Sequence, residues 1–148
     1  MSERPPSTNL KIKSGLLRKI HSMVVDHYPN EVAALIVGHR DEGWEIATNL
    51  LKIRIFKAKP RYVEYDLGDV FEKMKKFYVI GHLHSHPHRS EWSGSTVASK
   101  EDHNSWKEFY NVCLERYGRR PYVFIYAYPP GILNVYKEST PVSYVVVK

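Results

Sequence analysis

The chain has 148 residues, of which 43% are hydrophobic and 26% are charged. This length fits one domain, and the composition is that of a folded globular protein, which excludes disorder, collagen-like repeats and a coiled coil. The net charge of +6 suits a nucleic acid, an acidic protein or an anionic surface about equally, so charge alone selects no partner.

Membrane and secretory signals are not evident in the sequence. No apolar run approaches the ~20 residues that a membrane span needs. The first ten residues contain an acid and two prolines but no apolar core, so they do not resemble a secretory signal. We therefore expect no membrane association and, by default, a cytoplasmic location.

The cysteine content limits the possible metal chemistry. Cys113 is the single cysteine, which excludes an internal disulfide framework and a Cys-rich metal site. Any metal would have to be held by histidines and carboxylates.

The first half of the chain predicts alternating strands and helices. We expect a short strand at 10–13 and then a helix that is capped by Ser14 and ends near Tyr28 and Pro29. A buried strand is expected at 31–37, a turn at 38–43, one or two strands within 44–55 and a return strand at 61–65. The apolar stripe of the helix comprises Leu16, Leu17, Ile20, Met23 and Val24.

The second half continues this alternation. A helix around Val70 to Phe77 precedes a strand at 78–83, which runs into a histidine cluster and a Ser- and Gly-rich loop. A further helix from Ser99 to Tyr117, a hairpin of strands 122–128 and 132–136, and a terminal strand at 142–147 complete the chain. The pattern predicts one α/β domain over residues 1–148.

Four of the eight histidines lie within residues 82–88. Side chains at i and i+2 on a strand point to the same face, so His84 and His86 can approach one ion, and Pro87 ends the strand behind them. We interpret the pair as half of a zinc site, with His82 in the core or supporting the ligands and His88 on the surface. A catalytic zinc needs a third protein ligand and an open position for water.

Asp102 is the candidate for the third ligand. It belongs to the segment Ser99-Lys100-Glu101-Asp102, which begins a predicted helix. The same pattern is a helix-capping signal, with Ser99 as the cap and Asp102 favoured by the helix dipole. Taken alone, the segment favours capping, whereas the nearby histidine pair favours a metal ligand.

Together these segments resemble the signature of the JAMM (MPN+) zinc metalloprotease family. That signature is an early Glu, then His-Ser/Thr-His-Pro, then Ser-x-x-Asp, and the matching segments here begin at Asn30, Gly81 and Ser99 within residues 10–128. The resemblance implies a three-layer α/β/α sandwich around a mixed, curved sheet, of the JAMM/MPN and cytidine-deaminase-like type. It also implies one zinc ion on His84, His86 and Asp102, with Glu31 as general acid/base and Ser99 stabilising the oxyanion. The implied reaction is zinc-dependent cleavage of isopeptide bonds to ubiquitin or a ubiquitin-like modifier.

The chain departs from the family in one interval. Twelve residues, 87–98, separate His86 from Ser99, which is five more than the family usually has. Loop insertions cost little entropy when their ends are fixed, so the site can persist with an altered substrate entrance. We expect the long loop to form a flap on which Trp92 closes over substrate, although an inert surface insertion is an equal alternative.

Two other functions compete with this interpretation. The run from His82 to His88 also imitates the motif of histidine-triad nucleotide hydrolases, but Ser85 and Pro87 fit it poorly and Glu31 would have no task. A non-catalytic MPN scaffold is the other alternative, although such domains typically lose the ligands that this chain keeps. Zinc content and sensitivity to chelators separate all three.

The expected partners follow from the same resemblance. Conjugates of a ubiquitin-like modifier are the predicted substrates, and the basic run from Lys52 to Arg61 is a candidate contact for an acidic modifier. Aromatic residues are not interleaved with the basic ones, which disfavours nucleic-acid binding. The modifier and the oligomeric state are not encoded in any motif.

Overall fold

A computed structural model describes residues 9–59, 62–86, 107–137 and 140–148. Its main sheet has eight strands in the order β10-β1-β3-β2-β6-β7-β8-β9, and β4 and β5 form a separate hairpin. The helices are α1 (Ser14–His27), α2 (Leu67–Lys76) and α4 (Lys107–Tyr117). The strands are β1 (Leu10–Lys13), β2 (Ala33–Asp41), β3 (Trp44–Lys52), β4 (Ile55–Lys59), β5 (Tyr62–Tyr65), β6 (Val79–His86), β7 (Tyr122–Ala127), β8 (Ile132–Lys137), β9 (Thr140–Val142) and β10 (Val145–Val147).

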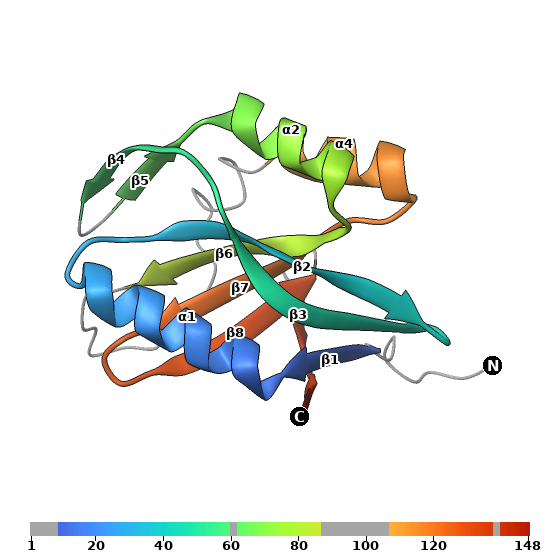
Figure 1. Cartoon of the computed structure of the whole chain (residues 1–148), viewed down its shortest axis with the longest axis horizontal. Coiled ribbons are helices and arrows are strands. Elements are labelled where there is room, and N and C mark those ends of the chain that lie inside the picture. Colours follow the sequence, from blue (N-terminus) through green and yellow to red (C-terminus); the bar gives the residue numbers. More distant parts are fainter. Residues whose placement is uncertain (1–8, 60–61, 87–106, 138–139) are drawn as a thin grey trace.

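The sheet is mixed and lies between helices on its two faces. β1 is parallel to β3 and β10, and β6 is parallel to β7, while the other neighbours in the sheet are antiparallel. α1 covers one face, and α2 and α4 cover the other (Figure 1). The predicted α/β/α sandwich around a mixed, curved sheet is confirmed.

Each helix is attached to the sheet by an apolar stripe. Leu16, Ile20 and Val24 recur at every fourth residue of α1 and are fully or almost fully buried against one face of the sheet. On the other face, Val70 and Met74 of α2 pack in one cluster with Phe109 and Cys113 of α4. These two apolar layers hold the sheet that carries the histidines.

The turn between the first long strands is shorter than predicted. β2 continues through Gly38 to Asp41, so the expected turn at 38–43 was wrong in extent. Only Glu42 and Gly43 make the reversal, with φ values of 49° and 84°. Two successive residues of positive φ form a tight hairpin turn whose twist matches that of the flanking strands.

Two other expectations at element ends were also wrong. Ser14 is the first residue of α1 rather than its cap, and Lys13 at the cap position makes no side-chain capping bond. The terminal strand predicted at 142–147 is two short strands, β9 and β10, at opposite edges of the sheet. Since only Ser143 and Tyr144 separate them, the sheet must curl until its edges approach each other.

A buried ion pair lies near the starts of β3 and β6. Glu45 accepts hydrogen bonds from the Tyr78 hydroxyl at 2.9 and 3.0 Å, and Arg119 lies 3.3 Å from the same carboxylate. Arg119 also donates to the carbonyl of Val79 at 3.1 Å. This cluster joins three parts of the fold at the end of β6 opposite to His86.

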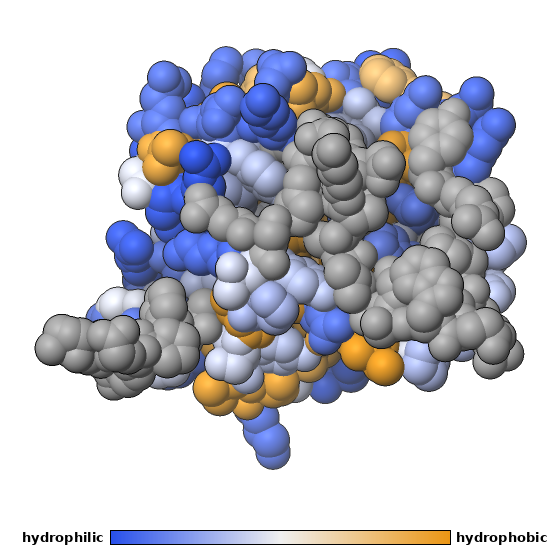
Figure 2. Space-filling view, turned by 180° about the vertical axis from the view of Figure 1, so that it is seen from behind, coloured by the Kyte–Doolittle hydropathy of each residue, from blue (hydrophilic) through white to orange (hydrophobic). Residues whose placement is uncertain are grey.

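One face of the described surface is mainly polar. Seen from behind, it is largely hydrophilic, with hydrophobic residues in small separate patches (Figure 2). Within the described parts of the chain, no helix has the length and apolar character required to cross a bilayer.

Candidate active site

An irregularity in β6 determines which way its histidines point. The pairing of β2 with β6 shifts between Ile36 and Val37, so Ile80 has no partner in the register. Because side chains alternate along a strand, one extra residue changes the face that all later side chains occupy. Beyond Ile80, Leu83 packs on the α1 side, whereas His82 contacts Phe109 on the α4 side.

Gly81 follows this bulge and packs directly against the next strand. A Cβ atom at Gly81 would lie 2.1 Å from the backbone oxygen of Tyr122, far inside van der Waals contact. The close approach of β6 and β7 at this point therefore requires glycine. It immediately precedes the three histidines of β6.

The imidazole rings of β6 form a stack on the α4 side of the sheet. The centroids of His84 and His86 are 5.2 Å apart with planes inclined by 24°, and those of His82 and His84 are 5.8 Å apart at 26°. Tyr110 of α4 continues the stack at 5.7 Å from His82, and its hydroxyl lies 3.3 Å from Nε2 of that histidine. His82 is fully buried, in agreement with the core or supporting position expected for it.

Glu31 is brought to the same place by the pairing of β2 with β6. Ala33 is opposite His84, and the amide of Ser85 donates to the carbonyl of Val32 at 3.0 Å. The Val32 amide in turn donates to the hydroxyl of Ser85 at 2.9 Å. Continuing this antiparallel register places Glu31 at the level of His86 and on the face that carries His84.

Burial separates these groups from ordinary surface side chains. Glu31 is 8% exposed, His84 2% and His86 6%. A carboxylate and two imidazoles are seldom buried without a specific role or partner. They lie at the ends of two neighbouring strands that are separated by more than fifty residues in sequence.

The β4–β5 hairpin lies next to this end of the sheet. The amide of Glu31 donates to the carbonyl of Lys59 at 2.8 Å, which links the hairpin to the start of β2. At the other end of β4, the amide of Arg54 donates to Asp69 of α2 at 2.7 Å. A hydrogen bond from Lys73 lowers the pKa of the Asp69 carboxyl, so it remains an anion at neutral pH.

The donor set is compatible with a zinc ion. Two neighbouring imidazoles on one face, His84 and His86, supply nitrogen ligands of the kind that zinc accepts. Among the described residues, no three His, Cys, Asp or Glu side chains form a metal-binding group. Asp102, the predicted third ligand, lies outside the described residues, as do Ser99, Trp92 and the rest of the long loop.

Some residues that shape this region were not identified from the sequence as parts of the site. Tyr110 was predicted only as part of a helical stripe, yet it stacks on His82. Ser85 was recognised as part of the motif, but its bond to the Val32 amide depends on a long-range strand pairing. The glycine at 81 carries no spacing signal, and only the approach of β7 reveals its role.

Comparison with known proteins identifies the fold. No protein-family model matches the chain, and no curated protein matches it. Among solved structures, it is similar to AF2198, a JAB1/MPN domain protein from Archaeoglobus fulgidus, with a TM-score of 0.60 and 24% identity over 93% of this chain and 99% of that one.

Two further solved structures are similar to the chain. One is described as a JAMM metalloprotease-like zinc site in the proteasome and signalosome, with a TM-score of 0.56 and 24% identity over 95% of this chain and 100% of that one. The other is the solution structure of DSY2949 from Desulfitobacterium hafniense, with a TM-score of 0.67 and 13% identity over 94% and 93%. The chain therefore has the JAB1/MPN fold.

Proposed function

We propose that this chain, which has the JAB1/MPN fold, is a zinc-dependent JAMM-type metallopeptidase. Its proposed substrates carry ubiquitin or a ubiquitin-like modifier, and the bond cleaved is the one to the modifier's C-terminus. The main support is the strand register which, continued by two residues from Ala33 opposite His84, puts buried Glu31 at the level of His86, and it adds to the motif resemblance. The similar fold of a JAMM metalloprotease-like structure supports the same class.

The proposed chemistry assigns separate tasks to the residues of the chain. His84, His86 and Asp102 would hold the zinc ion, which when bound polarises a carbonyl and lowers the pKa of water. Glu31 would accept a proton from the attacking water and deliver it to the leaving lysine amine. Ser99 would donate a hydrogen bond to the tetrahedral oxyanion.

The rigid placement of the imidazoles supports this assignment. Tyr110, His82, His84 and His86 stack one upon another, so the rotation of each ring is restricted by its neighbours. Preorganised ligands bind a metal with less loss of side-chain entropy. The Glu31 amide is bonded to the carbonyl of Lys59 in β4, a strand that also carries exposed Lys57, and these basic residues support an acidic modifier as partner.

The two alternatives remain distinguishable by experiment. A histidine-triad hydrolase would need its histidines even without metal and would not need Glu31. A non-catalytic MPN scaffold would show no cleavage with or without zinc. The similarity to JAB1/MPN structures favours the peptidase or the scaffold over the histidine-triad function.

Zinc content is the first measurement. Elemental analysis of the purified protein should give one zinc per chain, and His86→Ala or Asp102→Ala should lose it. His39→Ala, which removes an exposed histidine of β2, is the matched control and should retain full occupancy. An Asp102→Ala variant with full zinc would contradict the ligand set and leave Ser99-x-x-Asp102 as a helix cap.

Activity is the second measurement. A panel of ubiquitin and ubiquitin-like fusions should contain at least one substrate whose cleavage is lost with chelator and restored by zinc. Zinc binding without cleavage of any fusion would favour the scaffold. Cleavage of nucleotide substrates that persists in chelator would favour the histidine-triad alternative.

A further inference from the structure

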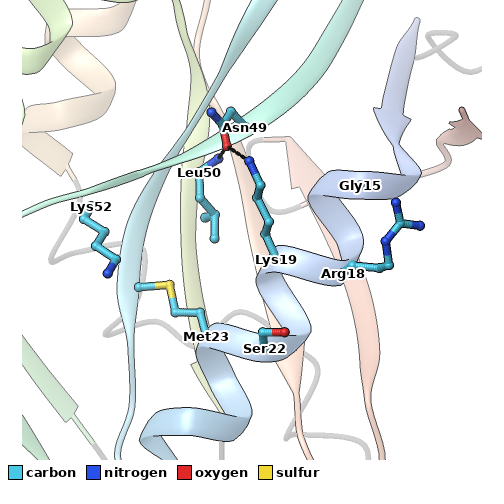
Figure 3. Close-up of a pocket in the computed structure, with 8 residues that line it drawn as sticks. All are labelled: Gly15, Arg18, Lys19, Ser22, Met23, Asn49, Leu50 and Lys52. Carbon is cyan, nitrogen blue, oxygen red and sulfur yellow. Dashed lines mark hydrogen bonds between the residues drawn. The ribbon is translucent and has the colours of Figure 1, made fainter.

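A second candidate site lies on the opposite face of the sheet. A groove of about 550 Å³ separates the first part of α1 from β3 (Figure 3). Its volume is within the usual range for small-ligand sites. The groove is lined by Gly15, Arg18, Lys19, Ser22, Met23, Asn49, Leu50 and Lys52.

The sheet separates this groove from the candidate active site. Leu50 packs in the apolar layer beneath α1, whereas His82 contacts Phe109 of α4 on the other face. Among the described residues, the side chains that line the groove belong to α1 and β3. A ligand in the groove would therefore lie on the other face of the sheet from the histidines.

The charge of the groove is entirely positive. Arg18, Lys19 and Lys52 line it, and no acidic residue is among the described residues that do. In the part of the chain that the structure describes, no carboxylate forms an ion pair with any of these three cations. An anion entering the groove would meet three cations that are not paired with any carboxylate of the described residues.

One of these cations is fixed in position. Lys19 Nζ donates to Oδ1 of Asn49 at 2.8 Å and so spans the groove from helix to strand (Figure 3). The same oxygen accepts from the amide of Leu50 at 2.9 Å. The ammonium group has further N–H donors for a ligand, and less of its side-chain freedom would be lost on binding.

The base of the groove is apolar. Met23 and Leu50 are partly buried and pack against the core beneath α1. Gly15 leaves space on the helix side, where a Cβ atom would meet only the guanidinium of Arg18 at 3.6 Å. A ligand that fills the groove therefore combines negative charge with an aliphatic group.

This combination selects among anionic ligands. A free phosphate would use the cations but not the apolar base. Proteins that bind single-stranded nucleic acid also stack its bases on aromatic rings, and no aromatic residue is among the described residues that line the groove. An acidic peptide that contains aliphatic residues matches both the cations and the apolar base.

We propose that the groove between α1 and β3 binds an acidic peptide segment of a partner protein, with an aliphatic side chain on Met23 and Leu50 and carboxylates on Arg18, Lys19 and Lys52. This binding does not depend on zinc or on peptidase activity. It is a docking function additional to the proposed catalysis.

The test uses a fluorescent peptide, Glu-Asp-Leu-Leu-Glu-Asp, and the intact protein. Fluorescence anisotropy at low salt should show saturable binding, and the double variant Arg18→Glu/Lys52→Glu should weaken it about tenfold or more. Ser22→Glu, at an exposed helical position, should weaken it by placing an acid inside the groove. The matched control is Lys75→Glu/Lys76→Glu on α2, which has the same charge change and should alter the dissociation constant less than twofold.

Each other outcome contradicts the proposal in a defined way. Equal weakening by the α2 control would show attraction by net charge alone. Equal affinity for Glu-Asp-Ser-Ser-Glu-Asp would show that the apolar base has no part. Tighter binding of a polythymidine oligonucleotide, lost in Arg18→Glu/Lys52→Glu, would identify a nucleic-acid site. Self-association lost in that double variant would identify a second copy of the chain as the occupant.

Discussion

At the scale of single residues, the candidate site depends on a reciprocal contact between two strands. Ser85 and Val32 exchange two hydrogen bonds, of 2.9 and 3.0 Å, at the point where β2 and β6 end their pairing. Val32 directly follows Glu31, and Ser85 lies between His84 and His86 in the sequence. The two bonds therefore link the segment of Glu31 to the segment of the histidines. The geometry of the proposed acid/base group is therefore set by backbone pairing.

Glu31→Gln tests the proposed proton transfer. Because the amide keeps the size of the carboxylate, zinc content and fold should be unchanged. The amide cannot accept a proton, so only the proton transfer should be lost. We expect kcat to fall by ~10²-fold or more, as for the loss of one general acid/base group. Glu64→Gln, on the exposed part of the β4–β5 hairpin, is the control and should keep full activity. Near-normal cleavage by Glu31→Gln at full zinc occupancy would refute the role of Glu31.

Gly81→Ala tests the close approach of β6 and β7. The new Cβ would collide with the Tyr122 backbone oxygen, and backbone cannot rotate away as a side chain can. We expect the free energy of unfolding to fall by ~1–3 kcal/mol or more, measured by urea denaturation, with weaker zinc binding. Gly15→Ala is the control, since its Cβ meets only Arg18 at 3.6 Å, and it should leave the protein as stable or more stable. Equal stability of the two variants would show that β6 and β7 can move apart.

At the scale of elements, the C-terminal segment joins the two edges of the curled sheet. β9 pairs with β8, and β10 pairs with β1, although only two residues separate β9 from β10. The Tyr144 hydroxyl between them donates to the carbonyl of Leu133 at 3.0 Å. Tyr144 also packs against the apolar core beneath α1.

Deletion of residues 143–148 tests this connection. It removes the β10 pairing and the Tyr144 contacts, and we expect a loss of ~2–4 kcal/mol in the free energy of unfolding. Val145→Thr/Val146→Thr keeps the strand and changes only side chains that are about half exposed, so it should alter stability little. An unchanged urea midpoint after the deletion would mean that the sheet keeps its curl without the segment.

At the scale of the whole molecule, tyrosines with raised pKa values should make the free energy of unfolding decrease at alkaline pH. Burial raises the pKa of several tyrosine hydroxyls above the ordinary value, and it raises the pKa of the Cys113 thiol to about 12. A raised pKa in the folded state means that stability is complete below the unfolded-state pKa and is lost as pH rises above it. The tyrosines concerned are Tyr65, Tyr78, Tyr117, Tyr122, Tyr126, Tyr136 and Tyr144.

The urea midpoint should therefore decrease on the alkaline side. We expect the decrease to begin near pH ~8.5, where an unfolded thiol ionises, and to steepen above pH ~10, where unfolded tyrosines ionise. Each fully linked group adds ~1.4 kcal/mol per pH unit to the slope. Cys113→Ala should remove the part of the decrease in urea midpoint that begins near pH ~8.5, because that part comes from the thiol. A midpoint that stays constant up to pH ~11 would contradict the buried state of these hydroxyls.

Local patterns in the sequence determined most of the elements. The apolar stripe of α1, the Pro-Pro-Gly hairpin between β7 and β8, and the period-two placement of His84 and His86 are properties of adjacent residues. Hydrophobic periodicity and strand alternation act over a few residues, so they can be read without a fold. The sandwich itself was implied by the resemblance to the JAMM family, and the fold agrees with that expectation.

Only the tertiary structure decided how these elements are joined. The bulge at Ile80 sets the face of the histidines, the pairing of β2 with β6 brings Glu31 to them, and the curl of the sheet divides the predicted terminal strand into β9 and β10. Arg119, which follows α4, is paired with the buried Glu45 of β3. Each of these features depends on contacts between residues far apart in the chain. The register of distant strands is fixed by the packing of the whole core, so it leaves no periodic signal in the sequence.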